Sequence, residues 1–581
     1  MKEITHKADL CVVGGGLAGM SVAISAARRG AKVILMQDRP VLGGNASSEV
    51  RMWICGAGAY GENNLETGIV EEIELENLYR NPNTSYSIWD SVLYEKVKYQ
   101  DNITLLLNCS CNDATMDGNR IKSIRGWQLT TETWHTVEAK LFADCSGDSI
   151  LAPLTGAEYR VGREASSEFN ESIEPEQADK KTMGMSCLIQ ARETDRPQTF
   201  IPPKWAYKYP TEEDLPHRGH DINSWSSNYW WIELGGEQDS IHDTEEIRDE
   251  LLKVAFGVWD HIKNYGDHDA ENWVLEWVGF LPGKRESRRY VGDHIMTQND
   301  VEAEGRFDDL VAYGGWSMDD HHPGGMNYPG IPTIFHPSPC PFGIPYRSLY
   351  SKNIDNLYFA GRNISVTHVA LSATRVMATC ATLGQAVGTA AAIAVRDNLS
   401  PREVYENSIK ELQQMLMDDD SYLPWNKREV PEISRNAELT ASEGNPELIR
   451  NGLDRPIGSE DNGWIGSLQD SWIEYKFDKQ RNIKAMRFVF DSNLNRKIKN
   501  MPCSFPLNSK KHAVPESMIK KFRIEALDES GKWNTALKVD NNYQRLVKIE
   551  TDITASALRF IPEETWGAEK AHMFSWDVDT K

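Results

Sequence analysis

The first residues with a chemical signature are the glycines of the segment Gly14-x-Gly16-x-x-Gly19. They follow an apolar run of strand length, residues 9–13, and precede an Ala-rich segment with helical periodicity, residues 17–29. In such a turn Gly14 permits the tight bend, Gly16 lets the backbone approach a pyrophosphate, and Gly19 allows close packing of helix on strand. The amino-terminal end of the helix attracts the phosphate charge. The segment therefore predicts a dinucleotide-binding turn.

A second predicted strand, residues 31–36, should end at the group that binds the ribose hydroxyls of the dinucleotide. Gln37 occupies that position and Asp38 follows it. A glutamine can hydrogen-bond a ribose but lacks the usual charge, so either residue can serve. The loop after them carries Gly43, Gly44 and two serines. This composition suits a second loop that contacts phosphate.

Acid–base chemistry is the first use suggested by the run Asp319-Asp320-His321-His322. A neighbouring carboxylate raises the basicity of an imidazole and fixes its tautomer, so these histidines can form an acid/base pair. The same run is compatible with a metal site or with a solvated polar loop. Adjacent histidines rarely chelate one ion well, and we predict no metal site.

The elements that must position these residues begin with a strand–turn–helix–strand unit in the first forty residues. Further strands are expected at 103–107, 141–144 and 354–360, with a hairpin signal at Asp117-Gly118-Asn119. A helix is expected from about 371 to 395. Its charge-free stretch is long enough to cross a membrane, but it consists of Ala, Gly and Thr with few large apolar residues. We expect a buried helix and no membrane span.

The rest of the chain changes character twice. Residues from about 162 to 350 are rich in Trp, Tyr, His and Pro, with long irregular stretches. A polar helix, 403–418, and a linker with an acidic triplet come next. Beyond residue 432, short alternating apolar runs are separated by turn residues at fairly regular intervals. This pattern predicts an antiparallel β-sandwich or jelly roll of about 150 residues.

The composition of the chain excludes several classes of protein and kinds of site. The chain has 581 residues, with 63 Lys and Arg against 86 Asp and Glu, a formal net charge of −23. Such an acidic chain is a poor general binder of nucleic acid. Its nine cysteines are sparse, odd in number and without zinc-knuckle spacing, which argues against a disulfide scaffold or a structural zinc site. The first residues show no signal peptide, so we expect a cytoplasmic protein, or a periplasmic one if this is a processed form.

Five segments together carry a resemblance to a known family. They are Gly14 to Gly19, Gly43-Gly44, Asp144-Cys145-Ser146-Gly147-Asp148, Ala360-Gly361-Arg362, and residues 375–388. With them, residues 1–400 resemble the FAD-dependent oxidoreductases related to the fumarate reductase and succinate dehydrogenase flavoproteins, which have a glutathione-reductase-type FAD domain. Within that family the chain is similar to bacterial proteins often found alongside carbohydrate-degradation genes.

The resemblance implies FAD as cofactor and an α/β architecture. We expect a Rossmann-like FAD-binding domain from 1–160 and 351–400, an inserted α+β substrate domain over 161–350, a helical linker over 401–432, and an antiparallel β-sandwich over 433–581. The residues expected to bind FAD are Gly14, Gly16, Leu17, Ala18, Gly19, Gln37, Asp38, Gly43, Gly44, Asn45, Ser47, Arg51, Ser146, Gly147, Asp148, Gly361, Arg362, Ile364, Gly384 and Gln385.

Catalysis is expected at His368, Arg375, His321 and His322. His368 lies between a strand end and a helix start, where a base over the flavin ring can stand; a structural hydrogen bond is the alternative. Arg362 and Arg375 can stabilise reduced flavin at N1 or bind a substrate carboxylate, and Arg375 can instead pair with an acid.

The carboxy-terminal residues resemble a discoidin-like domain of the coagulation factor 5/8 C type. The residues that carry this likeness are Asn451-Gly452-Leu453-Asp454, Trp464, Trp472-Ile473-Glu474-Tyr475 and Arg487-Phe488-Val489-Phe490. Both a glycan-binding role and a structural or assembly role are open for this part.

The expected function is hydride transfer between flavin N5 and a small organic substrate, preferably a sugar or sugar-derived compound. One alternative is reduction of a carbon–carbon double bond in an unsaturated acid. Another is a glycan-binding protein whose flavin site is vestigial. The electron acceptor is not identified by the sequence, and a homo-oligomer is left open.

Overall fold

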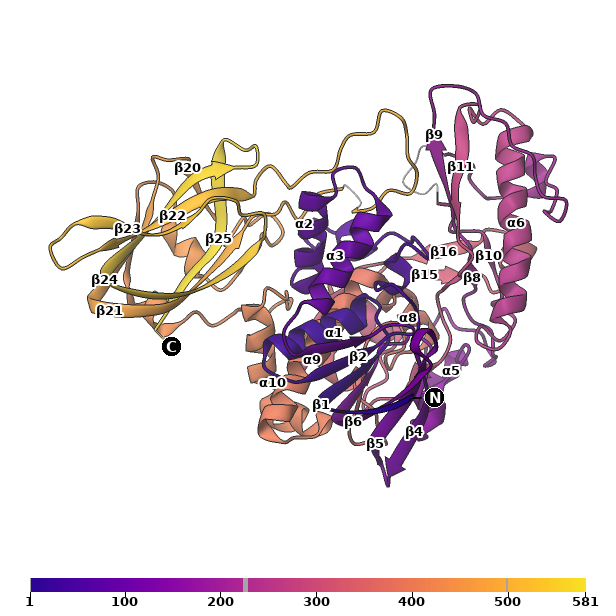
Figure 1. Cartoon of the computed structure of the whole chain (residues 1–581), viewed down its shortest axis with the longest axis horizontal. Coiled ribbons are helices and arrows are strands. Elements are labelled where there is room, and N and C mark those ends of the chain that lie inside the picture. Colours follow the sequence, from indigo (N-terminus) through magenta and orange to yellow (C-terminus); the bar gives the residue numbers. More distant parts are fainter. Residues whose placement is uncertain (1, 223–227, 498–499, 581) are drawn as a thin grey trace. The chain divides into compact units, whose positions relative to one another are not determined.

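The computed structural model describes residues 2–222, 228–497 and 500–580. Its contacts divide the chain into two compact units (Figure 1). Unit 1 comprises Met1–Tyr60, Asn83–Leu412 and Lys499–Lys511. Unit 2 comprises Gly61–Pro82, Gln413–Ile498 and His512–Lys581.

Unit 1 is organised by a largely parallel sheet that begins with the expected strand–helix–strand unit. Strand β1 (Lys2–Val13) leads through the glycine turn into α1 (Leu17–Arg28) and then into β2 (Val33–Met36). The parallel order is β3-β2-β1-β6-β18, with β3 (Ile103–Leu106), β6 (Thr133–Asp144) and β18 (Leu357–Phe359). All five strands therefore end at the same edge, where the loops that follow them meet.

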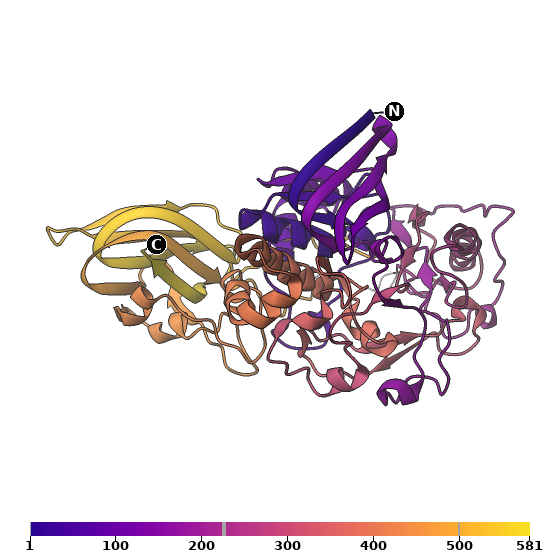
Figure 2. The ribbon, with the colours of Figure 1, turned by 90° about the horizontal axis from the view of Figure 1, so that it is seen from below.

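An antiparallel hairpin extends this sheet. Strands β4 (Cys109–Asp117) and β5 (Arg120–Gln128) are joined by Gly118 and Asn119, and Gly118 has a φ of 57°, as the hairpin signal predicts. Strand β6 pairs with β5 along its first half and with β18 along its last residues. At its amino-terminal end β1 pairs with the start of β6, Lys2 with Thr133, and Figure 2 shows this end of the sheet at the N label.

The expected helix over 371–395 is present as two helices. Helix α8 (His368–Thr374) ends before Arg375, and α9 (Met377–Asp397) begins after Val376. A Cβ atom at Gly384 or Gly388 would lie 2.1 Å or 2.3 Å from a backbone oxygen of α1. The small residues therefore let α9 and α1 touch. By length and composition α9 is the one described helix that passes for a membrane span, but 94% of its apolar window is buried in the protein.

The middle of unit 1 contains several short sheets and one long helix. Residues of α6 (Thr244–Asn264), β9 (Ile189–Glu193) and β11 (Trp273–Val278) share one hydrophobic core, and Figure 1 shows the helix beside the two strands. The other elements are α3 (Tyr86–Lys98), α4 (Leu151–Thr155), β7 (Tyr159–Arg160), α5 (Ser166–Phe169), β8 (Met185–Ser186), β10 (Glu233–Leu234), β12 (Gly283–Lys284), β13 (Arg289–Tyr290), α7 (Gln298–Glu302), β14 (Leu310–Gly314), β15 (Met318–His321), β16 (Thr333–His336) and β17 (Phe342–Pro345).

Unit 2 is built on an antiparallel sheet of order β20-β25-β21-β24-β22-β23, with β19 paired to β21. The strands are β19 (Glu438–Ala441), β20 (Trp464–Ser467), β21 (Ile473–Phe490), β22 (Ile519–Leu527), β23 (Trp533–Val539), β24 (Leu546–Thr565) and β25 (Lys570–Asp579). The long strands β21 and β24 are paired with register shifts, and an aromatic core that includes Trp464, Phe488 and Trp576 is fully buried. This arrangement is consistent with the expected β-sandwich.

Unit 2 also takes a helix from the amino-terminal part of the chain, which the sequence analysis places in the flavin domain. Helix α2 (Ile69–Arg80) contributes Leu75 and Leu78 to the core of this unit. Tyr79 stacks on Tyr543 with ring centroids 4.0 Å apart. Helix α10 (Pro401–Asp418) contains the expected polar helix, and the short α11 (Glu432–Asn436) precedes β19. The boundary between the flavin and substrate domains stays a prediction.

Candidate functional site

A cavity of about 720 Å³ lies in unit 1 at the carboxyl ends of the parallel strands. Its size falls within the usual range for ligand sites, about 300–1,000 Å³. The sequence-predicted residues that line it are Gly14, Gly16, Leu17, Ala18, Gln37, Asp38, Gly43, Gly44, Asn45, Ser146, Gly147, Asp148, Gly361, Arg362, His321 and Arg375. Loops that are far apart in the sequence therefore form one site.

The glycine turn leaves one end of this cavity open to a ligand. A Cβ at Gly16 would have a single neighbour within 4 Å, the Cα of Gly44 at 3.9 Å. No side chain caps α1 and no acidic residue lies in its first turn. Its free amide groups and the positive end of its dipole therefore suit a phosphate.

Two other glycines of the turn are required by packing. Gly14 has a φ of 101°, and a Cβ there would lie 2.4 Å from the carbonyl oxygen of Cys145. A Cβ at Gly19 would lie 1.8 Å from the carbonyl oxygen of Gly14. Gly19 lies outside the cavity lining, so it shapes the turn from behind.

The structure gives Gln37 and Asp38 different surroundings. Gln37 is buried; its Oε1 accepts a hydrogen bond from the Gly15 amide at 2.6 Å, and its Nε2 donates to the Val41 carbonyl at 3.2 Å. Its amide thus ties the glycine turn to the next loop. The side chain of Asp38 is 59% exposed, with Arg39 3.6 Å away. The ribose contact stays a prediction for both residues.

A charged group at Asp148 joins two of the loops. Its carboxylate accepts from Arg362 at 2.8 Å, Lys284 at 2.9 Å and Ser287 at 2.8 Å. Burial opposes ionisation of Asp148, but the two cations outweigh it and lower its pKa to about 2. Asp148 therefore stays charged at neutral pH and holds Arg362 at the cavity.

Several residues expected at the cofactor lie elsewhere. Gly384 packs on α1, Gln385 and Ile364 are buried, and the Ser47 hydroxyl accepts from the Glu49 amide at 3.3 Å. These four residues and Arg51 lie outside the cavity lining. Gly384 takes part in the close helix packing that the small residues predicted, and contact of the other residues with FAD stays a prediction.

Arg51 was expected to bind FAD, but its side chain contacts other parts of the protein. Its guanidinium lies 4.3 Å from the centre of the Tyr86 ring and 4.6 Å from that of the Trp277 ring. It also donates to Gln190 at 3.1 Å. The cation is therefore held between two aromatic rings of the protein, which satisfies its charge there.

At the other end of the cavity His321 lies between two carboxylates. Its Nδ1 donates to Glu233 at 2.7 Å, and its Nε2 lies 3.7 Å from Asp319, beyond hydrogen-bond distance. His321 is buried but lines the cavity. Because Glu233 holds the Nδ1 proton, the lone pair of a neutral His321 is on Nε2.

Each of the two carboxylates beside His321 also lies next to an arginine. Arg375, at the break between α8 and α9, pairs with Asp319, and its buried Nε makes no hydrogen bond within the described protein. Arg285 lies 3.4 Å from Glu233 and donates to the Trp230 carbonyl. The cations hold the pKa of both carboxyls below the usual range, although burial acts in the opposite direction. Thus both neighbours of His321 carry negative charge.

The structure separates the two adjacent histidines. His322 stacks on Tyr328 with ring centroids 3.6 Å apart, and its Nδ1 accepts from the Gly324 amide. It lies outside the cavity lining. The expected pairing of His321 with His322 is therefore corrected, because consecutive side chains at the end of a strand point to different sides.

His368 is also placed outside the cavity lining. Its Nδ1 lies 2.9 Å from Glu286 and its Nε2 3.3 Å from Asp320. Burial lowers its basicity, but Glu286 and Asp320 outweigh this and raise its pKa to about 10. A histidine protonated at neutral pH does not act as a base, so the structural alternative fits its geometry.

Glu233 is a functional candidate that was not predicted from the sequence. Glu233 is the one acid in the run Tyr229-Trp230-Trp231-Ile232-Glu233-Leu234. An acidic residue inside such an aromatic and apolar run is expected to be buried and paired with a cation or a histidine. Trp316 donates from its indole nitrogen to Asp319 at 3.0 Å and lines the cavity.

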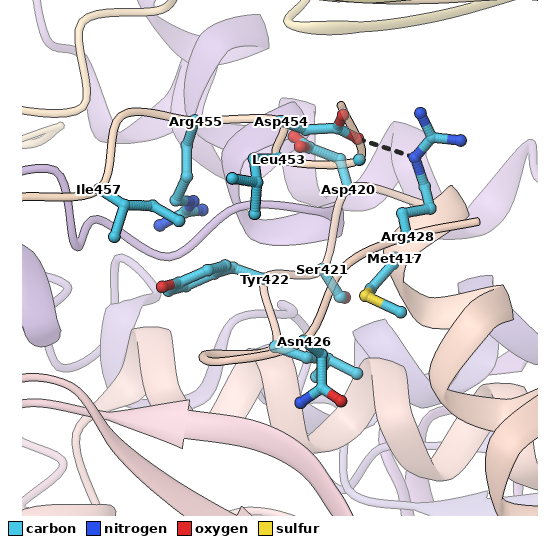
Figure 3. A pocket seen from close by; sticks show the side chains of 12 residues that line it. Met417, Asp420, Ser421, Tyr422, Asn426, Arg428, Leu453, Asp454, Arg455 and Ile457 are labelled. Carbon is cyan, nitrogen blue, oxygen red and sulfur yellow. Dashed lines mark hydrogen bonds and ion pairs between the residues drawn. The ribbon is translucent and has the colours of Figure 1, made fainter. Parts of the chain in front are cut away.

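Unit 2 has a small cavity of about 30 Å³ (Figure 3). That volume holds about one water molecule. Its acids are already paired: Asp420 accepts from Arg545 at 2.8 Å, and Asp454 from Arg428 at 3.1 Å and Arg487 at 2.7 Å. This cavity is too small for a sugar ring.

Comparisons with known proteins agree with the first unit's site. A family model described as "FAD dependent oxidoreductase" matches residues 9–416. Two curated fumarate reductases (cytochrome), from Shewanella frigidimarina and from its strain NCIMB 400, are each 63% identical over 38 residues. That match is 6% of this chain and spans 7% and 6% of the relatives' own lengths.

Two solved structures of carbohydrate-binding modules are also similar to a part of the chain. The family 32 module of Streptococcus pneumoniae EndoD has 16% identity and a TM-score of 0.20, covering 26% of this chain and 99% of that one. A fucose-binding module from Streptococcus pneumoniae has 11% identity and a TM-score of 0.20, covering 26% and 96%.

The residues present fit FAD. The cradle at Gly16 is open, α1 begins without a side-chain cap, and the cavity continues from the glycine turns to His321. FAD needs these features together, because the pyrophosphate in the middle of this extended molecule and the reactive ring at one end are held at separate places.

Proposed function

Because this chain belongs to the family of FAD-dependent oxidoreductases, we propose that it transfers a hydride between the flavin and a small organic substrate bound beside His321. The observation that carries the proposal is a single cavity that joins the glycine turns to the cluster of His321, Asp319 and Arg375. The electron acceptor is a separate reactant.

FAD would be held at three loops. The turn at Gly16 and the loop at Gly44 offer backbone amides to the pyrophosphate, and Arg362 is held by Asp148 at the loop after β18. When bound, FAD supplies a ring that accepts or donates a hydride at N5.

His321 is proposed as the proton acceptor when a substrate alcohol is oxidised. As the hydride leaves the carbon, the hydroxyl proton moves to the Nε2 of His321, whose Nδ1 proton stays on the hydrogen bond to Glu233. The negative charges of Glu233 and Asp319 stabilise the imidazolium that forms. In the opposite direction the same nitrogen returns the proton.

Arg375 is proposed to orient the substrate oxygen. It is anchored by Asp319, while its buried Nε makes no hydrogen bond within the described protein. A buried guanidinium donor without a partner costs free energy unless a ligand satisfies it. A substrate hydroxyl, carbonyl or carboxylate oxygen would do so.

A sugar or sugar-derived compound is the first proposed substrate class. Trp230, Trp316, Phe335 and Tyr60 line the cavity and supply aromatic faces for the C–H faces of a sugar ring. The ring of Trp230 lies 5.4 Å from that of His321, so a ring packed there is near the proposed base. Polar groups beside aromatic walls are typical of small-molecule sites.

An unsaturated acid is the second candidate. Arg375 and Arg285 both line the cavity, and paired cations suit a carboxylate. The short match to the fumarate reductases agrees with this class over its 38 residues. In that case one carbon of the double bond would take the hydride, and the protonated Nε2 of His321 would give its proton to the other carbon.

One anaerobic experiment separates these proposals. The purified FAD-loaded protein is mixed with sugars, sugar acids and polyols, and the oxidised flavin absorbance is followed. In parallel, the chemically reduced protein is mixed with fumarate and other unsaturated acids. Loss of absorbance with a sugar supports the first class, and its return with an unsaturated acid supports the second.

The same purified protein also tests whether the chain binds FAD at all. A protein that stays colourless after addition of FAD would contradict flavin chemistry and favour the reading as a binding protein with a vestigial site. A yellow protein that reacts with neither panel would contradict both proposed substrate classes.

A further inference from the structure

A second cluster of reactive side chains lies in unit 1, outside the lining of the large cavity. Glu212, His220, His261 and His268 each present one ligand atom, and these atoms all lie within 4.8 Å of one another. Glu212 opens a short 3-10 helix, His261 lies in the last turn of α6, and His220 and His268 lie in loops. The fold thus gathers four potential ligands from distant segments.

The separations of three ligand atoms match a tetrahedral metal site. The Nε2 atoms of His261 and His268 are 3.2 Å apart, and the Oε1 of Glu212 lies 3.3 Å and 3.2 Å from them. With metal–nitrogen bonds of 2.0–2.1 Å, tetrahedral geometry places neighbouring ligand atoms about 3.3 Å apart. The ring of His220 closes the group, with its Nδ1 3.2 Å from Oε2 of Glu212.

The tautomer of His261 turns a lone pair toward the centre of the group. Its Nδ1 lies 2.7 Å from the backbone carbonyl of Tyr209, which can only accept a hydrogen bond. The proton of a neutral ring is therefore on Nδ1 and the lone pair on Nε2. A carbonyl that orients a histidine in this way is a usual partner of metal-ligating imidazoles.

The three imidazoles of this group are largely buried. The side chains of His220, His261 and His268 are 6%, 1% and 11% exposed. Glu212 is the one acid among the four residues.

One nitrogen has no partner without a ligand. The Nε2 of His220 is buried and makes no hydrogen bond within the described protein. In a group of three neutral imidazoles, the Nε2 lone pair of His261 also faces a carboxylate oxygen at 3.3 Å. A shared proton would relieve the contact between His261 and Glu212, and so would a metal ion bound by both.

We propose that Glu212, His220, His261 and His268 form a structural site for a divalent transition metal, with zinc as the preferred ion. Imidazole nitrogen suits zinc, and a carboxylate completes a tetrahedral set. Because the protein supplies all four ligands, no position is left for a substrate. The ion would fasten the segment around Glu212 and His220 to the end of α6.

The proposed site departs from the prediction of no metal. That prediction rested on the adjacent pair His321 and His322 and on the cysteine spacings. The ligands proposed here have no motif spacing, and Gly266, with a φ of 75°, allows the turn that returns His268 to the end of α6. The folded chain supplies the proximity.

The test is a zinc titration of the full-length, FAD-loaded protein after treatment with a chelator. Calorimetry with zinc chloride should give one strong site per chain. Free zinc at 100 times the dissociation constant should shift the equilibrium between folded and unfolded protein about 100-fold, seen as a higher melting temperature. Absence of a strong site would overturn the proposal.

Variants locate the ion. H268A and E212Q should weaken zinc binding at least about tenfold, and E212Q is the safer variant because the Glu212 side chain is 63% exposed. H242A is the matched control: His242 precedes α6, is 71% exposed and pairs with Asp239. Equal zinc affinity in the wild type, H268A and E212Q, or an equal loss in H242A, would contradict the assignment.

Discussion

His321 and His368 are two buried histidines, each held between two carboxylates, and they differ in what else they reach. His321 lines the cavity, and its Nε2 lies 3.7 Å from Asp319. His368 has both ring nitrogens within 3.3 Å of carboxylate oxygens and lies outside the lining. Both side chains are buried beside carboxylates, so access to the cavity and an Nε2 beyond hydrogen-bond distance of a carboxylate separate the candidate acid–base group from the structural cation.

The largest expected effect is the loss of turnover in H321A. Removing a general acid–base group usually lowers the rate about 10²–10⁴-fold. FAD content should stay at the wild-type level, because the cofactor loops do not include His321. Anaerobic flavin reduction by the active substrate measures the rate, and H322A is the control, with a rate close to wild type. A wild-type rate of flavin reduction in H321A would show that His321 is not the acid–base group.

The next effect concerns stability at His368. H368Q leaves Glu286 and Asp320 without their shared cation, and breaking a buried ion pair costs about 3–5 kcal/mol of unfolding free energy. Urea unfolding of unit 1, followed through the release of FAD, measures this loss. A stable H368Q protein that cannot turn over substrate would instead make His368 the catalytic group.

A smaller effect is expected at the other end of the cavity. In G16A the added methyl group enters open space at a φ of −67°, so the fold should persist. The methyl group should prevent close approach of the pyrophosphate and weaken FAD binding about tenfold, or about 1.4 kcal/mol. G219A is the control, because a Cβ there has no neighbour within 4 Å. Equal FAD affinity in both variants would contradict the proposal that the pyrophosphate lies against the backbone at Gly16.

A pH dependence of stability is also expected. Because the pKa of His368 is raised from 6.5 to about 10 in the folded protein, its stabilising contribution is complete below pH 6.5 and is lost as pH rises through about 10. Unfolding free energy should therefore fall more steeply from pH 7 to pH 10 in the wild type than in H368Q. Parallel slopes in urea titrations would show that His368 is not a charged structural group.

The parts of the fold that depend on neighbouring residues were predictable. The turn at Gly14 and the hairpin at Gly118 each need a backbone conformation that few other residues adopt, and both are present. The small residues of α9 likewise predicted close packing. The break at Arg375 was not predicted, because nothing in the local composition of 371–395 interrupts helical periodicity.

The site was predictable only in part, for a related reason. A glycine turn between a strand and a helix predicts a phosphate-binding loop from local sequence. The role of a histidine depends instead on the residues that surround it in the folded protein. His321 depends on Glu233, 88 residues earlier in the chain, and the local pattern paired it with His322 instead. Helix α2 shows the same limit at a larger scale, since Leu75 and Leu78 join a core made mainly of residues beyond 430.

The sequence by itself therefore determined the dinucleotide turn, the order of the elements around it and the flavin family. These follow from short-range backbone requirements that are legible residue by residue. The tertiary structure alone decided which histidine reaches the cavity, which remains a buried cation, and which three gather with Glu212 near the end of α6. Those outcomes depend on contacts between distant segments, and the charge and burial that set each histidine's chemistry exist only after the chain has folded.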